Sequence, residues 1–140
     1  MKQKKELTME NQRNMALQIV PALLLAGVGG EVRTERGLAY TVVTMEDGLE
    51  MMTEKKDFIL LDVRRKNEFA EGHIPGAINI PNEAIGEKEI SQLPRKDQRI
   101  FVYCRSGRRS KQAAMKLYHL GYTDIIEFGG ILDYDGELEY

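Results

Sequence analysis

Residues 100–110, I-F-V-Y-C-R-S-G-R-R-S, contain the only cysteine of the 140-residue chain, Cys104. The β-forming residues 100–103 predict a short strand that ends on this cysteine. A loop over residues 104–109 follows, and Ser110 opens an apolar pattern of helical period over residues 110–120. A strand, a tight loop and a helix start in this order direct backbone N–H groups and the positive end of a helix dipole to one place, which suits an anion.

The thiol of Cys104 lies at the start of this loop. A lone cysteine is often a small buried apolar residue without chemistry, but a core cysteine is not normally followed at once by R-S-G-R-R. A thiol beside three arginines and a helix start loses its proton easily. Gly107 allows the loop to turn tightly, because a glycine has no Cβ to clash. The stretch therefore predicts an anion-binding site that contains a thiolate nucleophile.

The rest of the chain alternates between strand and helix patterns. Strands are predicted at residues 39–43, 58–63, 77–80, 100–103 and 124–128. Helices are predicted after a capping box at Thr44, at 87–93, and at 110–120 before Gly121. This alternation indicates an α/β fold, a parallel sheet of about five strands with helices on both faces. Since sites form at the carboxyl ends of such strands, Asp62, Val63 and Arg64 are expected at the same sheet edge as Cys104.

The composition fits one globular domain, since 42% of the residues are hydrophobic and 30% are charged. The formal net charge of −2 gives nucleic acid no general attraction. Positive charge gathers in one short stretch, at Arg105, Arg108, Arg109 and Lys111. A single cysteine excludes an internal disulfide, and one cysteine with two distant histidines cannot form a zinc site.

Residues 1–30 differ in character from the rest of the chain. A basic start precedes an apolar run, 15–28, which is shorter than the ~20 residues that a membrane-spanning helix needs. This order is typical of a secretory signal peptide with a cleavage site before Glu31. It predicts an exported protein (periplasmic or extracellular) whose mature part, 31–140, has no stable membrane span. Pro21, which interrupts the apolar run, supports the alternative of an extra helix or a flexible arm on a cytoplasmic protein.

Three separated motifs carry a resemblance to a known family. The loop has Cys104, Gly107 and Arg109 at the positions of a C-x-x-G-x-R pattern, and it resembles the active-site loop of rhodanese-like sulfurtransferases. Upstream, L-D-V-R at 61–64 is followed by E-F and by G-H-I-P-G, and F-G-G-I stands at 128–131. These stretches are similar to the family's other hallmarks in order and spacing. The resemblance covers nearly all of the chain beyond its N-terminus and implies a rhodanese-like fold.

The resemblance also implies roles for the matching residues. Cys104 is the nucleophile and carries the sulfur as a persulfide, so that no cofactor is needed. Arg109 closes the loop and can bind an anion or the loop's own carbonyl groups. Asp62 and Arg64, which match the family's D-V-R, are interpreted as bracing the loop through an ion pair or hydrogen bonds, with direct substrate contact as the alternative. The anion-binding loop comprises Arg105, Ser106, Gly107, Arg108, Arg109 and Ser110. Within it, Arg105 and Arg108 either focus charge or are solvated surface residues.

Neither histidine is expected to act as a base. His73, in G-H-I-P-G, is interpreted as a turn histidine bonded to nearby backbone or to Glu68, and His119 as a surface residue near a helix end. The acidic stretch 133–140, D-Y-D-G-E-L-E-Y, is interpreted as a solvated tail. Tyr134 stands where the family often has a tryptophan.

The resemblance implies a double displacement of sulfur. Cys104 takes a sulfane sulfur from thiosulfate or a related small donor and passes it to cyanide, a thiol or a sulfur-accepting protein partner. One alternative is a cysteine phosphatase, but its C-x5-R loop would need an arginine at 110, where Ser110 stands. The other is a non-catalytic module of the same fold that binds sulfur or an anion, and the retention of Cys104, Gly107 and Arg109 argues against it.

Overall fold

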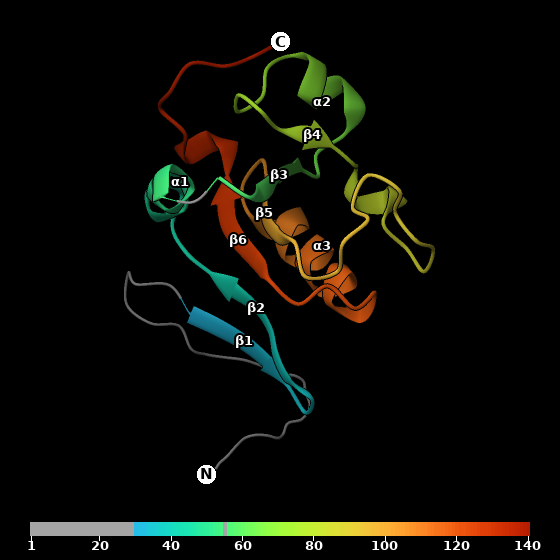
Figure 1. Cartoon of the computed structure of the whole chain (residues 1–140). Coiled ribbons are helices and arrows are strands. Elements are labelled where there is room, and N and C mark those ends of the chain that lie inside the picture. Colours follow the sequence, from blue (N-terminus) through green and yellow to red (C-terminus); the bar gives the residue numbers. More distant parts are fainter. Residues whose placement is uncertain (1–29, 55) are drawn as a thin grey trace.

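The apolar segments pair into a six-stranded sheet with the order β1-β2-β6-β5-β3-β4 in the computed structural model, which describes residues 30–54 and 56–140. The strands are β1 (Gly30–Thr34), β2 (Gly37–Val42), β3 (Phe58–Asp62), β4 (Ile78–Asn79), β5 (Arg99–Cys104) and β6 (Ile125–Gly130). The helices are α1 (Met45–Glu54), α2 (Lys66–Ala70) and α3 (Arg108–His119), with two 3₁₀ turns, η1 (Asn82–Ala84) and η2 (Ile131–Asp133). Figure 1 shows their arrangement.

The five strands that the sequence predicts all pair in parallel with one another in the sheet. β5 lies between β3 and β6, and Asp62 of β3 pairs with Tyr103, the residue before Cys104. Because parallel strands end at the same edge, Asp62 and Cys104 lie at one edge of the sheet. The predicted α/β class and the shared edge are confirmed.

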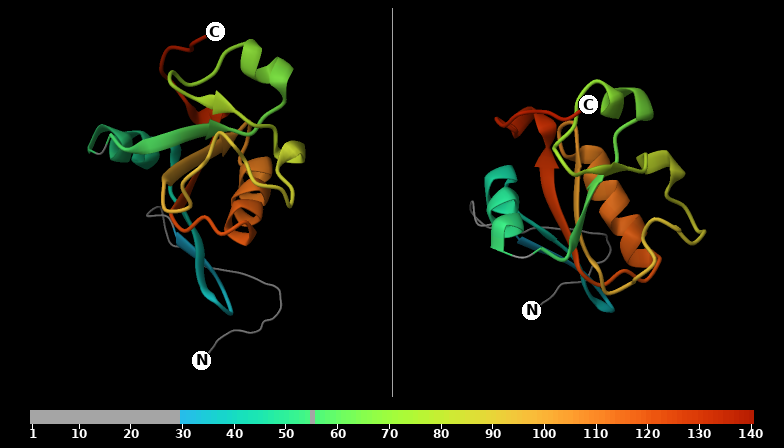
Figure 2. Two further views of the ribbon diagram at one scale, coloured as in Figure 1. Left: turned by 45° about the vertical axis from the view of Figure 1, so that its right-hand side comes forward. Right: turned by 45° about the horizontal axis from the view of Figure 1, so that its top comes forward.

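Helices cover both faces of the sheet, as predicted (Figure 2). On one face, α3 packs Ala113, Ala114 and Leu117 against the central strands, all fully buried. On the other face, α1 packs beside a group of edge-to-face aromatic rings, in which Phe101 and Phe128 have centroids 5.8 Å apart. Strand β5 is buried on both sides, which explains its unbroken apolar sequence.

Helix α1 begins where the capping box predicts. The Thr44 Oγ1 accepts the backbone N–H of Asp47 at 3.0 Å and so satisfies one of the free donors of the first turn. The apolar side chains of the helix join one cluster beneath it: Met45, Leu49, Met51 and Met52. Gly48 sits against Phe128, where a Cβ would lie 2.6 Å from the nearest ring carbon.

Two elements were not predicted. β1 pairs antiparallel with β2 and turns the parallel sheet into a mixed one. Its residues alternate between partly buried and exposed, and polar residues such as Glu31 and Arg33 hide the strand pattern. α2 is only five residues long, and its first turn is held by Glu68, whose Oε1 accepts the Arg65 N–H at 2.9 Å.

The predicted helix at 87–93 is wrong, since these residues form an irregular loop. The loop is anchored on both sides by the buried side chains of Ile85 and Leu93. The hydroxyl of Tyr122 also donates to the Leu93 carbonyl at 2.6 Å. The run E-K-E at 87–89 offers no apolar face, so that these anchors decide the conformation.

The prediction of a solvated tail is also wrong in part. Glu139 forms an antiparallel bridge with His73, with backbone hydrogen bonds of 2.9 and 2.8 Å. Its carboxylate accepts the N–H of Gly76 at 2.8 Å. The end of the chain therefore pairs with the G-H-I-P-G turn. The segment 1–30, predicted as a secretory signal or an arm, lies outside the described residues except for Gly30, and export remains a prediction.

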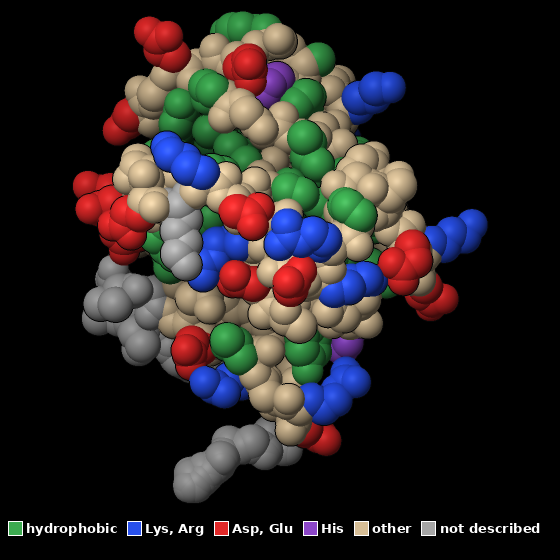
Figure 3. Space-filling view, viewed as in Figure 1, with side chains coloured by type: hydrophobic (Ala, Val, Ile, Leu, Met, Phe, Trp, Pro, Cys, Tyr) green, Lys and Arg blue, Asp and Glu red, His purple; other side chains and the backbone are tan. Residues whose placement is uncertain are grey.

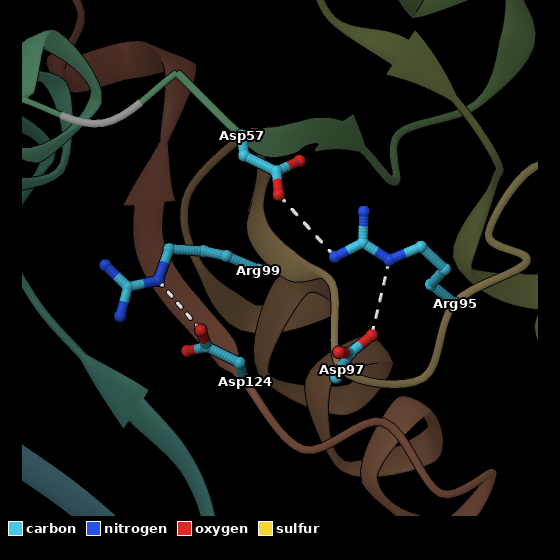
Figure 4. Close-up of a pocket in the computed structure, with 5 residues that line it drawn as sticks. All are labelled: Asp57, Arg95, Asp97, Arg99 and Asp124. Carbon is cyan, nitrogen blue, oxygen red and sulfur yellow. Dashed lines mark hydrogen bonds and ion pairs between the residues drawn. The ribbon is translucent and has the colours of Figure 1, made fainter.

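The opposite edge of the sheet, where the parallel strands begin, carries opposite charges that alternate on the surface (Figure 3). They line a hollow formed by Asp57, Arg95, Asp97, Arg99 and Asp124 (Figure 4). Arg95 lies 3.5 Å from Asp57 and 3.3 Å from Asp97, and Arg99 lies 3.0 Å from Asp124. The charges compensate one another, so this edge is a solvated ion-pair network. Among the described residues, no helix is long and apolar enough to cross a bilayer.

The contact between Gly48 and Phe128 yields a test of the packing. Alanine at an exposed helix position would stabilise by about 1 kcal/mol relative to glycine. We expect Gly48→Ala to lower the free energy of unfolding by about 1–3 kcal/mol instead, because the Cβ overpacks the aromatic cluster. Urea unfolding measures the difference.

The matched control is Gly86→Ala, where an added Cβ meets nothing within 4 Å. We expect that change to leave stability within about 0.5 kcal/mol of the wild type. A stabilised Gly48→Ala variant would contradict the close packing of α1 on β6.

Candidate functional site

The loop after β5 is shorter than predicted. Cys104 ends the strand, and α3 begins at Arg108 rather than at Ser110, so that Arg105, Ser106 and Gly107 alone form the connection. Gly107 is the N-cap residue and has φ 107°, a left-handed conformation that glycine adopts without strain. The predicted need for a glycine at this turn is confirmed.

The sulfur of Cys104 lies inside the turn. Its side chain is buried, and its Sγ accepts the backbone N–H of Gly107 at 3.0 Å. Ser110, in the first turn of α3, places its Oγ 3.4 Å from the same sulfur. The sulfur thus sits at the N-terminus of a 12-residue helix, where the free N–H groups and the helix dipole favour negative charge. This geometry suits a thiolate or a persulfide.

The F-G-G-I stretch supports the loop from beneath. Gly130, the last residue of β6, leaves no room for a side chain, since a Cβ there would overlap the carbonyl group of Arg105. That carbonyl accepts the N–H of Leu132 at 3.2 Å. The second glycine of the motif is therefore needed for the close approach of the loop to β6.

Arg109 is held by a residue outside the loop. Its guanidinium donates to both carboxylate oxygens of Glu68 on α2, at 2.8 and 3.1 Å. The sequence predicted an anion or the loop's own carbonyls as its partner, and Glu68 was foreseen only as a contact of His73. The hydrogen bond from Arg109 lowers the pKa of Glu68 to about 2. The same bond raises the pKa of Arg109 above its ordinary value.

Asp62 and Arg64 form the predicted ion pair, 2.7 Å apart and buried. The Arg64 guanidinium also donates to the carbonyl of Gly72 at 2.8 Å and lies 5.9 Å from the centroid of the Tyr103 ring. The pair thus fastens the end of β3 to the G-H-I-P-G turn and packs against the residue before Cys104. Burial, followed by the charge of Asp62, raises the pKa of Tyr103, so its hydroxyl stays neutral and accepts the Ile74 N–H.

The other arginines of the loop face solvent. Arg105, Ser106 and Arg108 are exposed around the buried sulfur. Their charges can attract an anion to the loop whether or not they touch it.

Neither histidine contacts Cys104 or the loop that follows it. His73 holds its Nδ1 2.9 Å from the carbonyl oxygen of Phe69 and stacks on that ring at 3.6 Å between centroids. Its Nε2 is 3.5 Å from Glu139. It is bonded to nearby backbone, as predicted, while the suggested contact with Glu68 is replaced by Glu139. His119 is exposed at the end of α3.

One charged residue near the sulfur, Glu127, was missed, and the contact between it and Lys111 was not foreseen. Glu127 of β6 is completely buried and accepts a short hydrogen bond from Ser110 and the N–H of Gly129 at 3.0 Å. Lys111 of α3 lies 3.4 Å from its other oxygen. A glutamate inside the apolar run I-I-E-F was the signal, because a charge in a buried strand needs partners.

Comparisons with known proteins agree with this geometry. Residues 44–136 match the family model described as "Rhodanese-like domain". The chain is 31% identical over 112 residues to the putative sulfur carrier protein YrkF of Bacillus subtilis, covering 79% of this chain and 60% of that protein. It is 38% identical over 73 residues to thiosulfate sulfurtransferase PspE of Escherichia coli, covering 52% of this chain and 70% of that protein.

A solved structure of similar shape is the rhodanese-like domain protein from Staphylococcus aureus. It superposes with a TM-score of 0.61 at 28% identity, over 70% of this chain and 95% of that one. The matched region contains the cysteine loop, the D-V-R stretch and the F-G-G-I stretch. The chain belongs to the rhodanese-like domain family.

Proposed function

We propose that this protein is a thiosulfate sulfurtransferase that carries sulfur as a persulfide on Cys104. Its relatives support sulfur transfer as the activity of the family. The observation that carries the proposal is the Gly107 N–H directed at the Cys104 sulfur, 3.0 Å away, at the N-terminus of α3. A site that stabilises negative charge on one sulfur atom suits both the attacking thiolate and the persulfide that follows.

The reaction proceeds in two displacements. The Cys104 thiolate attacks the outer sulfur of thiosulfate, the sulfur–sulfur bond of the donor breaks, and sulfite leaves with the bonding electron pair. The persulfide then remains on Cys104. An acceptor such as cyanide or a thiolate attacks the outer sulfur, and the Cys104 thiolate is released with its electron pair. These two displacements need no cofactor, because Cys104 itself carries the sulfur.

The charged residues around the loop have two kinds of role, attraction of the donor and support of the loop. Arg105 and Arg108 are exposed and attract the dianionic donor to the loop. Arg109 is occupied by Glu68 and holds α3 to α2, so that its role is to fix the first turn of the helix. Asp62 and Arg64 brace the adjoining turn in the same way.

The phosphatase alternative has less support. A phosphatase loop of the C-x5-R type needs an arginine fork that points at the bound phosphate. Here Ser110 stands at that position, and the fork of Arg109 faces Glu68. The turn between Cys104 and α3 encloses one sulfur atom beneath a single glycine N–H.

The nucleophile is tested by Cys104→Ser. We expect its thiosulfate:cyanide sulfur transfer to fall to the uncatalysed background, because a serine hydroxyl cannot hold the sulfur. Mass spectrometry of the wild type after thiosulfate treatment should show one added sulfur atom on Cys104 and none on the variant. Thermal unfolding of the variant, compared with that of the wild type, checks that the variant is folded. Retained turnover by the variant, or an aryl phosphatase activity of the wild type equal to its sulfur transfer, would contradict the proposal.

The contact between Glu68 and Arg109 predicts that the free energy of unfolding depends on pH. The pKa of Glu68 is lowered from 4.5 to about 2 in the folded protein. The stabilisation is therefore fully present above pH 4.5 and is lost as the pH falls toward 2. We expect Glu68→Gln to be less stable than the wild type at neutral pH and to approach it in stability as the pH is lowered through this window.

Urea unfolding at a series of pH values measures this difference. Glu50→Gln, which removes an exposed carboxylate from α1, is the matched control and should track the wild type throughout. A stability difference for Glu68→Gln that does not change with pH would show that the Arg109 contact does not control the titration of Glu68.

A further inference from the structure

Glu127 has no role in the sulfur displacement described above, yet only the Ser110 hydroxyl lies between its carboxylate and the sulfur of Cys104. Its side chain has no solvent exposure, and it reaches Cys104 through a single hydroxyl group. Oε2 of Glu127 contacts Ser110 Oγ, and Ser110 Oγ in turn lies 3.4 Å from Cys104 Sγ. Ser110 is itself completely buried, so bulk water does not separate the two acids.

The carboxylate is incompletely compensated for a buried charge. Oε2 accepts the N–H of Gly129 and the Ser110 hydroxyl, but Oε1 has no hydrogen-bond partner among the described residues. The nearest cation, Lys111 Nζ, is 3.4 Å from Oε1 and its side chain is half exposed. A buried oxygen without a hydrogen bond is costly when it carries charge and much less so when it is the carbonyl oxygen of a neutral carboxylic acid.

The Ser110 hydroxyl has more possible hydrogen-bond partners than it has hydrogens to donate. Its Oγ carries one hydrogen, and it lies within hydrogen-bonding distance of oxygens of Glu127, Gly107 and Gly129 besides the sulfur of Cys104. A hydroxyl can donate once and accept from its other side. It can therefore pass a proton along the line from Cys104 to Glu127 by accepting one hydrogen and donating another.

We propose that Glu127 is a positioning residue that acts through Ser110 and accepts the thiol proton of Cys104, so that the two acids share one negative charge. Two anions separated by one hydroxyl in a buried site repel each other strongly. The state in which the thiolate is paired with a neutral Glu127 avoids this repulsion. This inference deepens the proposed function, since it rests on Cys104 as the nucleophile.

The proton transfer is balanced within the protein. The Cys104 thiol gives its proton to Ser110 Oγ as the hydroxyl proton of Ser110 moves to Glu127 Oε2. The negative charge moves from Glu127 to the sulfur, and no proton is exchanged with solvent. Afterwards the protonated Glu127 donates to Ser110 Oγ, whose hydrogen is then free to point at the thiolate.

The other ionisable groups around Cys104 and Glu127 do not exchange protons with these two residues over the pH range of the titration. Burial, with the charge of Glu127 as the second cause, raises the pKa of Tyr40 of β2 to about 12, which keeps that hydroxyl neutral over the range concerned. Lys111 and Arg109 of α3 are cations, and Arg109 is already paired with Glu68. The charges of Asp62, at the end of β3, and Arg64, which follows that strand, compensate each other.

Because Cys104 is the sole cysteine, the infrared absorption of its S–H bond reports its ionisation without any reaction. In the wild type we expect the S–H band to disappear in two steps as the pH rises, with a plateau of intermediate intensity while one proton is shared. Glu127→Gln keeps the size of the side chain but cannot exchange the proton. We expect its S–H band to disappear in one step.

Serine variants test the bridge and cover the case in which Glu127→Gln does not fold. Ser110→Ala should shift the ratio of thiolate to thiol on the plateau severalfold, since it removes the hydroxyl that hydrogen-bonds to whichever of the two acids is charged. Ser110→Thr keeps a hydroxyl and should retain the plateau. Glu50→Gln, the exposed control on α1, should leave the two-step profile unchanged.

A single step in the wild type would overturn the proposal, as would two steps in Glu127→Gln or an unchanged plateau in Ser110→Ala. The measurement needs no sulfur donor. A failure of sulfur transfer would therefore leave the proton-sharing result intact, and a one-step titration would leave the sulfurtransferase proposal intact.

Discussion

The contact between the Gly107 N–H and the Cys104 sulfur depends on where β5 ends and α3 begins. The strand places the sulfur at the sheet edge, and the left-handed backbone at Gly107 turns the chain so that the helix starts above it. Only three residues connect the strand to the helix, so the loop has little conformational freedom. Any residue with a Cβ at position 107 would adopt that φ of 107° only under strain. The rest of the structure holds the two elements in this relation.

Three neighbouring elements do so through contacts of different kinds. β6 supports the loop by close approach, since Gly130 admits the Arg105 carbonyl where a side chain would not fit. α2 holds the first turn of α3 through the fork between Arg109 and Glu68. β3 fixes the turn beside them through Asp62 and Arg64. These three elements contain the separated motifs found in the sequence. Each motif contacts the cysteine loop, the first turn of α3 or the turn beside them.

The sequence predicted the five parallel strands, the capping of α1 and the cysteine loop because each rests on a local pattern. An unbroken apolar run, a Thr44 with its capping partner and a glycine at a tight turn all act within a few residues. It did not predict β1, whose polar residues alternate at an edge, or the loop at 87–93, whose conformation is set by distant anchors such as Tyr122. It placed Arg109 in the loop, whereas Arg109 lies in the first turn of α3. It could not identify Glu68 as the partner of Arg109, because the two residues are 41 positions apart in the sequence.

The distribution of charge around the sulfur is compatible with the proposed binding of an anion at the loop, although acids surround it. Glu68 is neutralised by a two-point contact with Arg109, and Asp62 by Arg64, so that neither opposes an approaching donor. Arg105 and Arg108 remain exposed, and the proposed donor would meet their positive charge. Glu127 is the exception, because its partner Lys111 is half exposed and its Oε1 lacks a hydrogen bond. A buried acid of this kind would weaken an anion site if it stayed charged beside the thiolate. In the proposed proton transfer, Glu127 becomes neutral as the sulfur of Cys104 becomes charged, which removes that opposition. This would make a glutamate compatible with a position where an apolar residue is otherwise expected.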